Sequence, residues 1–233
     1  LVVSAAVRPA AAESDGTPAY LTDRIHPALL RFADNVTFYH GFSRRTVAEM
    51  AAGSAKPAAA GVEGKWTEES ISFETADNGN PALAAGSLKF AAAGNLDLER
   101  RGTLVFRIRP LRWVRSDNEP SFWPLFIFAE KGYVQFGRQG KLIEQGVLKR
   151  ADTIFTIVYG AKQKVIGQAV NYAGTSGWKD EWHTMALTWQ VGRMGLSVDG
   201  GPASPIPLDH ELGRASWFQV GHPYRTHEGS MIL

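Results

Sequence analysis

The stretch from Asp180 to Gly201, DEWHTMALTWQVGRMGLSVDGG, constrains the fold more than any other part of this chain. Between residues 183 and 189, bulky side chains occupy every second position, and small ones occupy the positions between them. A second short apolar run, Met194–Val198, ends at Asp199-Gly200, a dipeptide that supplies the positive φ of a hairpin turn. This alternation is typical of half-buried antiparallel strands. We therefore expect antiparallel sheets.

The same pattern recurs along the chain from residue 36 onwards. The segment Gly102–Pro110, GTLVFRIRP, places its leucine, phenylalanine and isoleucine on one face and Arg107 and Arg109 on the other. One helical turn is expected at Thr46–Ala51. About a dozen short strands, without strand–helix alternation or a fixed repeat, predict an all-β sandwich or barrel. The other expected strands are Val36–Phe42, Ile71–Thr75, Ser87–Phe90, Phe122–Ala129, Tyr133–Gly137, Lys141–Leu148, Thr153–Tyr159, Val165–Val170, Ser204–Leu208, Trp217–Val220 and Gly229–Leu233.

The composition narrows the class of protein. The 233 residues, 44% of them hydrophobic and 11% aromatic, suit one large β domain with a sizeable core. The net charge of +2, spread along the chain, gives no electrostatic reason to bind nucleic acid or an anionic membrane. No run of apolar residues reaches the roughly 18 needed to span a bilayer. The absence of cysteine excludes disulfides and thiolate metal sites.

Three blocks of the sequence resemble the laminin-G-like, concanavalin A-like jelly-roll domains. They are GSLKFAAAGNLDLERRGTLVFRIRPLRW (86–113), EWHTMALTWQVGRMGLSVDGG (181–201) and WFQVGHP with EGSMIL (217–233). The family typically shows a Gly-Asn-Leu turn, a Trp-His strand ending in Thr-Trp, an L-x-V-D/N-G hairpin and a closing F-x-hydrophobic-G strand. The resemblance covers roughly residues 38–233. It implies a two-sheet antiparallel jelly-roll sandwich with a concave face.

The resemblance also implies a range of functions. Members of this family bind carbohydrate or protein, often with calcium, or serve as accessory domains in secreted enzymes and surface proteins. Some members are glycosidases or lyases, so the fold alone does not decide between binding and catalysis. A secreted or cell-surface location is expected mainly because of this fold.

The residues give little support to catalysis. A retaining glucanase needs two carboxylates about 5–5.5 Å apart, and the usual E-x-D-x-x-E string is absent. Asp97 and Glu99 are two residues apart but belong to a turn, where exposed acids are ordinary. His183 is expected to be a packed, hydrogen-bonded residue of the sheet. We therefore expect a non-enzymatic module that binds a polysaccharide or a protein. The alternatives are a polysaccharide-degrading enzyme or its accessory domain, and a self-assembling surface or filament protein.

Candidate ligand residues come from two patterns. Aromatic rings near loops can stack on sugars while polar groups fix the orientation of the ligand. Arg107 and Arg109 on their solvated strand face join this set. Calcium prefers oxygen ligands on rim loops, so Asp117 and Asn118 in one loop and Asp180 in another are candidate ligands for Ca²⁺, although turn formation also explains these residues. The aromatic candidates are Trp113, Trp123, Tyr133, Tyr172 and Trp178.

The two ends of the chain carry the remaining expectations. Residues 1–35 are predicted to be an irregular N-terminal extension, and residues 36–233 the jelly-roll domain. Residues 1–12 could be the remnant of a signal peptide, although Arg8 and Pro9 interrupt that pattern. The last strand looks cut short at Leu233, which would leave an open sheet edge beside Val36–Phe42. We expect either a fragment of a longer protein or a partner strand, from the extension or from another subunit.

Overall fold

The computed structural model describes residues 2–5, 33–42, 46–61, 65–66, 71–73, 87–111, 122–139, 142–150, 153–160, 164–166, 181–207, 212–221 and 230–232. Within these ranges no helix is long and apolar enough to cross a membrane. One 3-10 turn, Ala33–Asn35, accompanies nineteen strands. The strands are β1 (Val2–Ala5), β2 (Val36–Tyr39), β3 (Met50–Ala51), β4 (Ala59–Gly61), β5 (Lys65–Trp66), β6 (Ile71–Phe73), β7 (Ser87–Ala91), β8 (Gly102–Leu111), β9 (Phe122–Ala129), β10 (Gly132–Gln139), β11 (Leu142–Glu144), β12 (Val147–Arg150), β13 (Thr153–Gly160), β14 (Lys164–Ile166), β15 (His183–Gln190), β16 (Arg193–Val198), β17 (Ser204–Pro207), β18 (Ala215–Gly221) and β19 (Ser230–Ile232).

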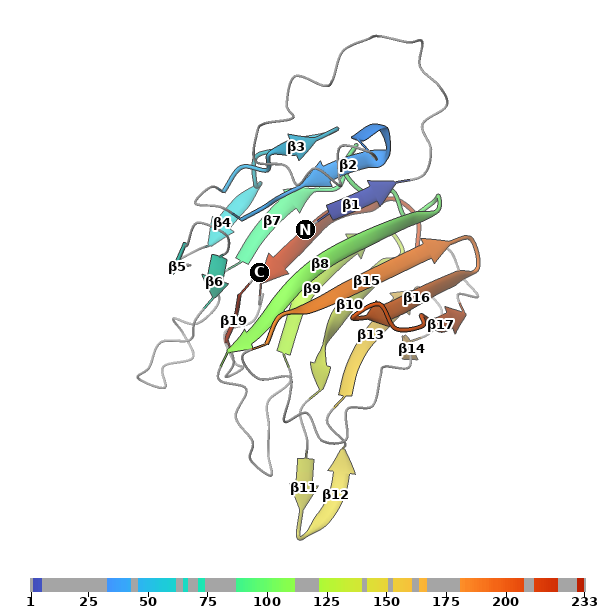
Figure 1. Ribbon diagram of the computed structural model, residues 1–233. Helices are drawn as coiled ribbons and strands as arrows, with labels where there is room; N and C mark the ends of the chain where they lie inside the picture. The colour runs from blue at the N-terminus through green and yellow to red at the C-terminus, as the bar shows by residue number, and fades with distance from the viewer. Residues whose placement is uncertain are drawn as a thin grey trace.

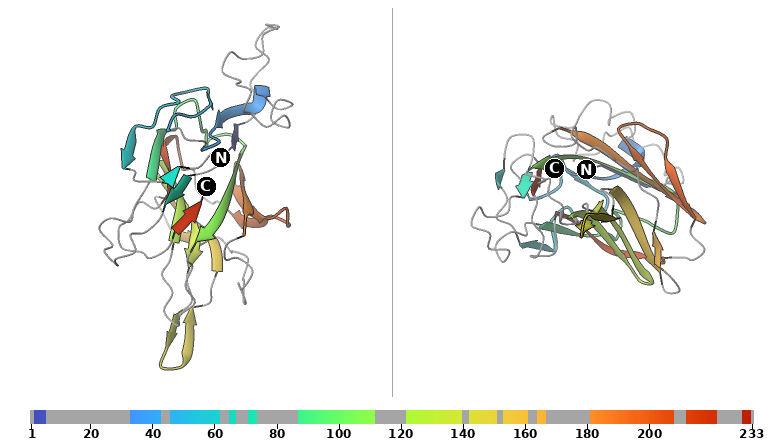
Figure 2. Two further views of the ribbon diagram at one scale, coloured as in Figure 1. Left: turned by 60° about the vertical axis from the view of Figure 1, so that its left-hand side comes forward. Right: turned by 90° about the horizontal axis from the view of Figure 1, so that it is seen from below.

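The strands form a two-sheet antiparallel jelly-roll sandwich, as the sequence predicts (Figure 1). The first sheet, here called the β8 sheet, runs in the order β17-β16-β15-β8-β1-β2-β3, with β19, β5 and β6 joined beside β8. The second, the β9 sheet, runs β14-β13-β10-β9-β18-β7-β4. Seen from below, the two sheets form two layers facing one another (Figure 2). Each sheet therefore has one face toward its partner and one face away from it.

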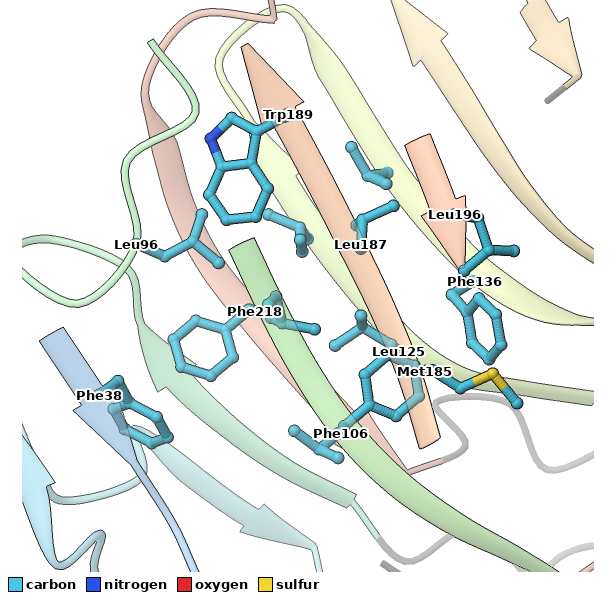
Figure 3. Close-up of a cluster of buried hydrophobic side chains, with 14 of the residues drawn as sticks. Phe38, Leu96, Phe106, Leu125, Phe136, Met185, Leu187, Trp189, Leu196 and Phe218 are labelled. Carbon is cyan, nitrogen blue, oxygen red and sulfur yellow. The ribbon is translucent and has the colours of Figure 1, made fainter. Parts of the chain in front are cut away.

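One apolar core fills the space between the sheets (Figure 3). Leu187 and Trp189 from the β8 sheet pack in the same buried cluster as Leu125 and Phe136 from the β9 sheet. Phe106 and Ile108 belong to it as well, which confirms the strand parity predicted for Gly102–Pro110. Each fully buried side chain of this size contributes about 1.5–3 kcal/mol relative to exposure. The core therefore accounts for the pairing of the two layers.

Asn95, in the Gly-Asn-Leu turn between β7 and β8, connects three segments of the chain. Its side chain is fully buried. The side-chain Oδ1 accepts a hydrogen bond from the backbone N–H of Gly53 at 2.8 Å, and Nδ2 donates to the carbonyl oxygens of Ser54 and Ala91 at 2.9 and 3.0 Å. Its own carbonyl accepts from the hydroxyl of Thr37 at 2.7 Å. The turn therefore holds the β2–β3 region against the end of β7.

The N-terminal segment contributes a strand that the sequence did not reveal. β1 lies between β8 and β2 and is antiparallel to both, with Val2 opposite Val105 and Tyr39. β19 lies along the same edge of β8, with Ile232 opposite Arg109. β2 is paired with β3 on its other side. The edge expected to be open beside Val36–Phe42 is thus occupied, and one of its two neighbours comes from the N-terminal segment.

Two local expectations were wrong. The helical turn expected at Thr46–Ala51 is an irregular segment that ends in β3. The single strand expected at Lys141–Leu148 is a hairpin, β11–β12, which projects from the sandwich (Figure 1). Gln145 and Gly146 adopt φ values of 51° and 75°, the conformation of a two-residue hairpin turn. Gln-Gly is a weaker turn signal than Asn-Gly or Asp-Gly, so periodicity alone did not separate the two strands.

Candidate functional site

Four aromatic rings form a continuous row across the face of the β9 sheet that points away from the core. Tyr159 on β13 is opposite Tyr133 on β10, and Tyr133 is opposite Phe128 on β9. Phe128 is in turn opposite Trp217 on β18. Because opposite residues of an antiparallel pair share one face, the four rings stand side by side at right angles to the strands. We call this row the aromatic ladder.

Neighbouring rings of the ladder are in contact: the two outer pairs are stacked, and Phe128 is tilted by 34° against Tyr133. Ring centroids are 5.2 Å apart for Tyr133 and Tyr159, 5.8 Å for Phe128 and Tyr133, and 3.8 Å for Phe128 and Trp217. The Nζ atom of Lys89 lies 3.8 Å from the centroid of the Trp217 ring. The inner rings therefore have neighbours on both faces and present their edges outward. Tyr159, at the end of the row and 44% exposed, has a described ring against only one of its faces.

A row of amides runs beside the ladder. Gln135 on β10 and Gln219 on β18 are the cross-strand neighbours of Phe126 on β9, which is 2% exposed although it lies outside the core cluster. Both glutamine side chains are 8% exposed, and neither amide makes a hydrogen bond to another described residue. The sequences of β7, β9, β10, β13 and β18 contain no aspartate or glutamate.

A second surface lies on the opposite side of the sandwich, on the outward face of the β8 sheet. Arg107 and Arg109 project from β8, and Trp182 immediately precedes β15. The guanidinium carbons lie 5.1 and 5.6 Å from the centroid of the Trp182 ring. Both distances are within the range of a cation–π interaction. We call these three residues the arginine–tryptophan cluster.

Hydrogen bonds place Trp182 beside the two arginines. The carboxylate of Asp199 accepts from the backbone N–H of Thr184 at 2.7 Å and bonds His183 Nδ1 at 2.7 Å. Asp199 and Gly200 have φ values of 49° and 74°, as expected for the turn that follows β16. His183 is largely buried, which confirms that it is a packed residue of the sheet. These contacts tie the start of β15 to the β16–β17 turn.

A buried histidine near β2 offers no accessible chemistry. The His40 Nδ1 atom accepts from the backbone N–H of Phe42 at 2.9 Å, so it carries no proton, and its 3.7 Å approach to Glu49 is not an ion pair. Burial lowers the pKa of His40 to about 3. Burial, and then the charge of Glu49, raises the pKa of Tyr39. Because His40 is fully buried, this group serves the fold rather than a ligand.

A depression of about 290 Å³ lies near the hairpin that joins β15 and β16. Thr188 and Arg193 line it, and Gly195 leaves room between Thr188 and Pro205. The depression is open to solvent. Among the described residues, no group of three histidine, aspartate or glutamate side chains could hold a metal ion.

The structure places only some of the predicted ligand-binding residues close to one another. Arg107 and Arg109 lie together on the outward face, as predicted, and Tyr133 is part of the aromatic ladder. Trp123 lies in β9, but its side chain is outside the described part of the structure. The remaining candidates lie outside the described residues: Trp113, Tyr172 and Trp178 for sugar, and Asp117, Asn118 and Asp180 for calcium.

Sequence reasoning missed the partners of these residues. Trp182, Phe128, Trp217 and the two glutamines were not singled out, because their positions depend on the register between strands that are distant in sequence. One signal was present. The sequence of β9, FWPLFIFA, has aromatic or apolar residues on both faces, which is unusual for a strand with a solvated side.

No protein-family model matches the sequence, and no curated protein sequence matches it. Solved structures resemble the fold. The carbohydrate recognition domain of Emp47p has 11% identity, with 84% of this chain and 90% of that chain covered, and a TM-score of 0.50. The binding domain of botulinum neurotoxin DC in complex with SialylT has 10% identity, 76% and 39% coverage, and a TM-score of 0.51.

SCLam, a non-specific endo-β-1,3(4)-glucanase of family GH16, has 12% identity, 78% and 74% coverage, and a TM-score of 0.46. At such low identities the likeness concerns the fold alone. Together with the sheet order, the likeness to the Emp47p domain shows that the chain has a concanavalin A-like jelly-roll fold.

Proposed function

We propose that this protein is a non-catalytic carbohydrate-binding module whose ligand lies across the outward face of the β9 sheet. The observation that carries the proposal is the combination of the aromatic ladder with the unbonded amides of Gln135 and Gln219. The outward face of a solvated antiparallel sheet is ordinarily polar. A face with four partly exposed aromatic rings, beside two amides that make no hydrogen bond to a described residue, suits a ligand that is itself both apolar and rich in hydroxyls.

The geometry assigns different tasks to the two rows. Glutamine amides can donate to and accept from neighbouring sugar hydroxyls at the same time. The inner rings present their edges, whereas the end ring, Tyr159, offers the more exposed aromatic surface for stacking on a pyranose. Hydrogen bonds are therefore expected to orient the ligand, and stacking at Tyr159 to anchor one end of it.

The absence of acids from the strands of this face supports a binding role rather than hydrolysis. Glycoside hydrolysis ordinarily requires two carboxylates that flank the scissile bond, and β7, β9, β10, β13 and β18 supply none. A carbohydrate recognition domain and a toxin binding domain among the structural neighbours are consistent with this role by analogy of fold. Extracellular or cell-surface polysaccharides are the natural ligands of such a module.

The test is binding to an array of neutral and acidic glycans, followed by titration calorimetry with the best neutral oligosaccharide. The double variant Q135A/Q219A should weaken binding at least tenfold while it keeps the parent's melting temperature. Gln190→Ala, an exposed glutamine on the other sheet, is the matched control and should bind as the parent does. Absence of any neutral ligand, or equal binding by Q135A/Q219A, would contradict this assignment. Release of reducing ends from the ligand would show catalysis instead.

A further inference from the structure

The arginine–tryptophan cluster has an excess of positive charge that the described structure does not neutralise. No carboxylate lies within ion-pairing distance of Arg107 or Arg109 among the described residues. The Nε atom of Arg109 is buried and has no hydrogen-bond acceptor. Two like charges on alternate positions of one strand face repel each other. The sheet thus keeps together two cations that have no anion between them.

Two described acidic residues close in sequence to Trp182 and the β16–β17 turn do not pair with the arginines. Asp199 uses both carboxylate oxygens, one for the backbone of Thr184 and one for His183. Glu181 precedes Trp182 and is exposed, without an ion pair to either arginine. The described residues therefore supply the cluster with an aromatic ring but no counterion.

From this arrangement we propose that Arg107, Arg109 and Trp182 form a binding site for the oxyanion of an acidic polysaccharide. A guanidinium group presents paired N–H donors that match a carboxylate or sulfate in a two-point contact. The indole ring holds both guanidinium groups by cation–π attraction and excludes water from one side of them. An anion bound between the arginines would also remove their mutual repulsion and give Arg109 Nε an acceptor.

The site is separate from the amide row, because it lies on the opposite outer face of the sandwich. The two arginines indicate that an anion binds here, and only the assumption that this anion belongs to a polysaccharide rests on the proposed function. The anion itself could be the carboxylate of a uronate or a sulfate ester. A carboxylate and a sulfate ester would make the same kind of contact with the arginines, so the experiment uses one probe of each kind to distinguish them.

The experiment compares four probes by titration calorimetry at low and high salt: an oligogalacturonate, a sulfated oligosaccharide, a neutral dextran oligomer and a short single-stranded DNA. We expect one acidic oligosaccharide to bind, more weakly in high salt, with the neutral oligomer and the DNA at least tenfold weaker. R107Q/R109Q should weaken acidic binding at least tenfold. Trp182→Leu, which leaves both charges in place, should weaken it several-fold.

The matched control is R100Q/R214Q, which removes two exposed arginines outside the cluster and lowers the net charge equally, from +2 to 0. It should bind acidic oligosaccharide within twofold of the parent. If both double variants lost the same affinity for the acidic oligosaccharide, the overall charge of the protein would account for binding, and the proposed site would be wrong. DNA binding as tight as that of the oligosaccharide, or no acidic binding at all, would overturn it too.

The two proposals can fail separately. Neutral binding that depends on Gln135 and Gln219, without acidic binding, would leave only the proposed function standing. Acidic binding that depends on Arg107 and Arg109 but not on the glutamines would leave only this second site. Thermal melting of each variant separates lost binding from lost folding.

Discussion

The indole ring of Trp189 lies directly against the backbone of Gly102, its cross-strand neighbour at the start of β8. A Cβ atom at position 102 would come within 2.3 Å of Trp189 Cζ2. The indole Nε1 donates a hydrogen bond to the carbonyl of Asp97 at 2.8 Å. The ring is thus fixed from two sides, and it closes one end of the core.

Gly102→Ala is therefore expected to destabilise the protein by about 1–3 kcal/mol, because the added methyl group must displace the indole. Trp189→Ala should cost more, about 3–5 kcal/mol, through the cavity it leaves. In G102A/W189A the methyl group has room, so Gly102→Ala should add little to the cost of Trp189→Ala. Urea unfolding of the three variants measures this coupling. Additive costs would show that the close approach is not the source of the strain.

Asn95→Asp is expected to destabilise the fold more than Asn95→Ala at neutral pH. The aspartate would keep the acceptor for Gly53 but would place a charged oxygen against the carbonyls of Ser54 and Ala91. Loss of the buried donors costs about 1–3 kcal/mol, and the unpaired charge adds to this. Protonation of the aspartate should recover part of the loss, so the difference between the two variants should narrow as the pH falls toward 4. A difference independent of pH would contradict the prediction.

Lowering the pH should reduce the free energy of unfolding because of His40. Burial lowers the pKa of His40 in the folded state to about 3, whereas the unfolded chain takes up a proton near the ordinary value of 6.5. The stabilisation that comes from keeping His40 neutral in the folded state is fully present above pH 6.5. It is lost as the pH falls from 6.5 toward 3, by about 1.4 kcal/mol of unfolding free energy per pH unit for one proton. In His40→Asn, whose side-chain oxygen can still accept from Phe42, this slope should disappear. Denaturant unfolding between pH 7 and pH 4 measures it, and equal slopes in both proteins would refute the assignment.

Asp199→Ala should destabilise the protein by about 1–3 kcal/mol. Alanine loses both carboxylate contacts and adopts the φ of 49° less readily than aspartate does. Asp199→Asn keeps an oxygen for the N–H of Thr184 and tolerates the same φ, so its cost should be smaller. Thermal unfolding ranks the variants. An asparagine variant as unstable as the alanine variant would show that the contact with His183 dominates.

The elements that the sequence predicted well are those with strong alternation. Phe122–Ala129 coincides with β9, and the core face of Gly102–Pro110 is correct to the residue. β1 escaped prediction because Val2–Ala5 is short and lies within an alanine-rich segment that has no period of its own. β1 forms a strand because it pairs with β8, which is distant from it in the sequence.

The same distinction applies to the candidate site. Strand parity was enough to place Arg107 and Arg109 on an outward face. It could not supply Trp182, because the register between β8 and β15 is set by the pairing of two strands that are far apart in the sequence. The aromatic ladder depends on three successive registers at once, and so it could not be assembled from local patterns.

The placement of the two surfaces on opposite outer faces has a consequence for assembly. Two sheets about 10 Å apart, and the core between them, separate a ligand on one side from a ligand on the other. Occupancy of one face therefore leaves the other uncovered, and a single molecule could cross-link two polymer strands. Mixed with long neutral and acidic chains together, such a bivalent module would raise the viscosity of the solution, whereas R107Q/R109Q would bind only the neutral strand and leave the network unformed.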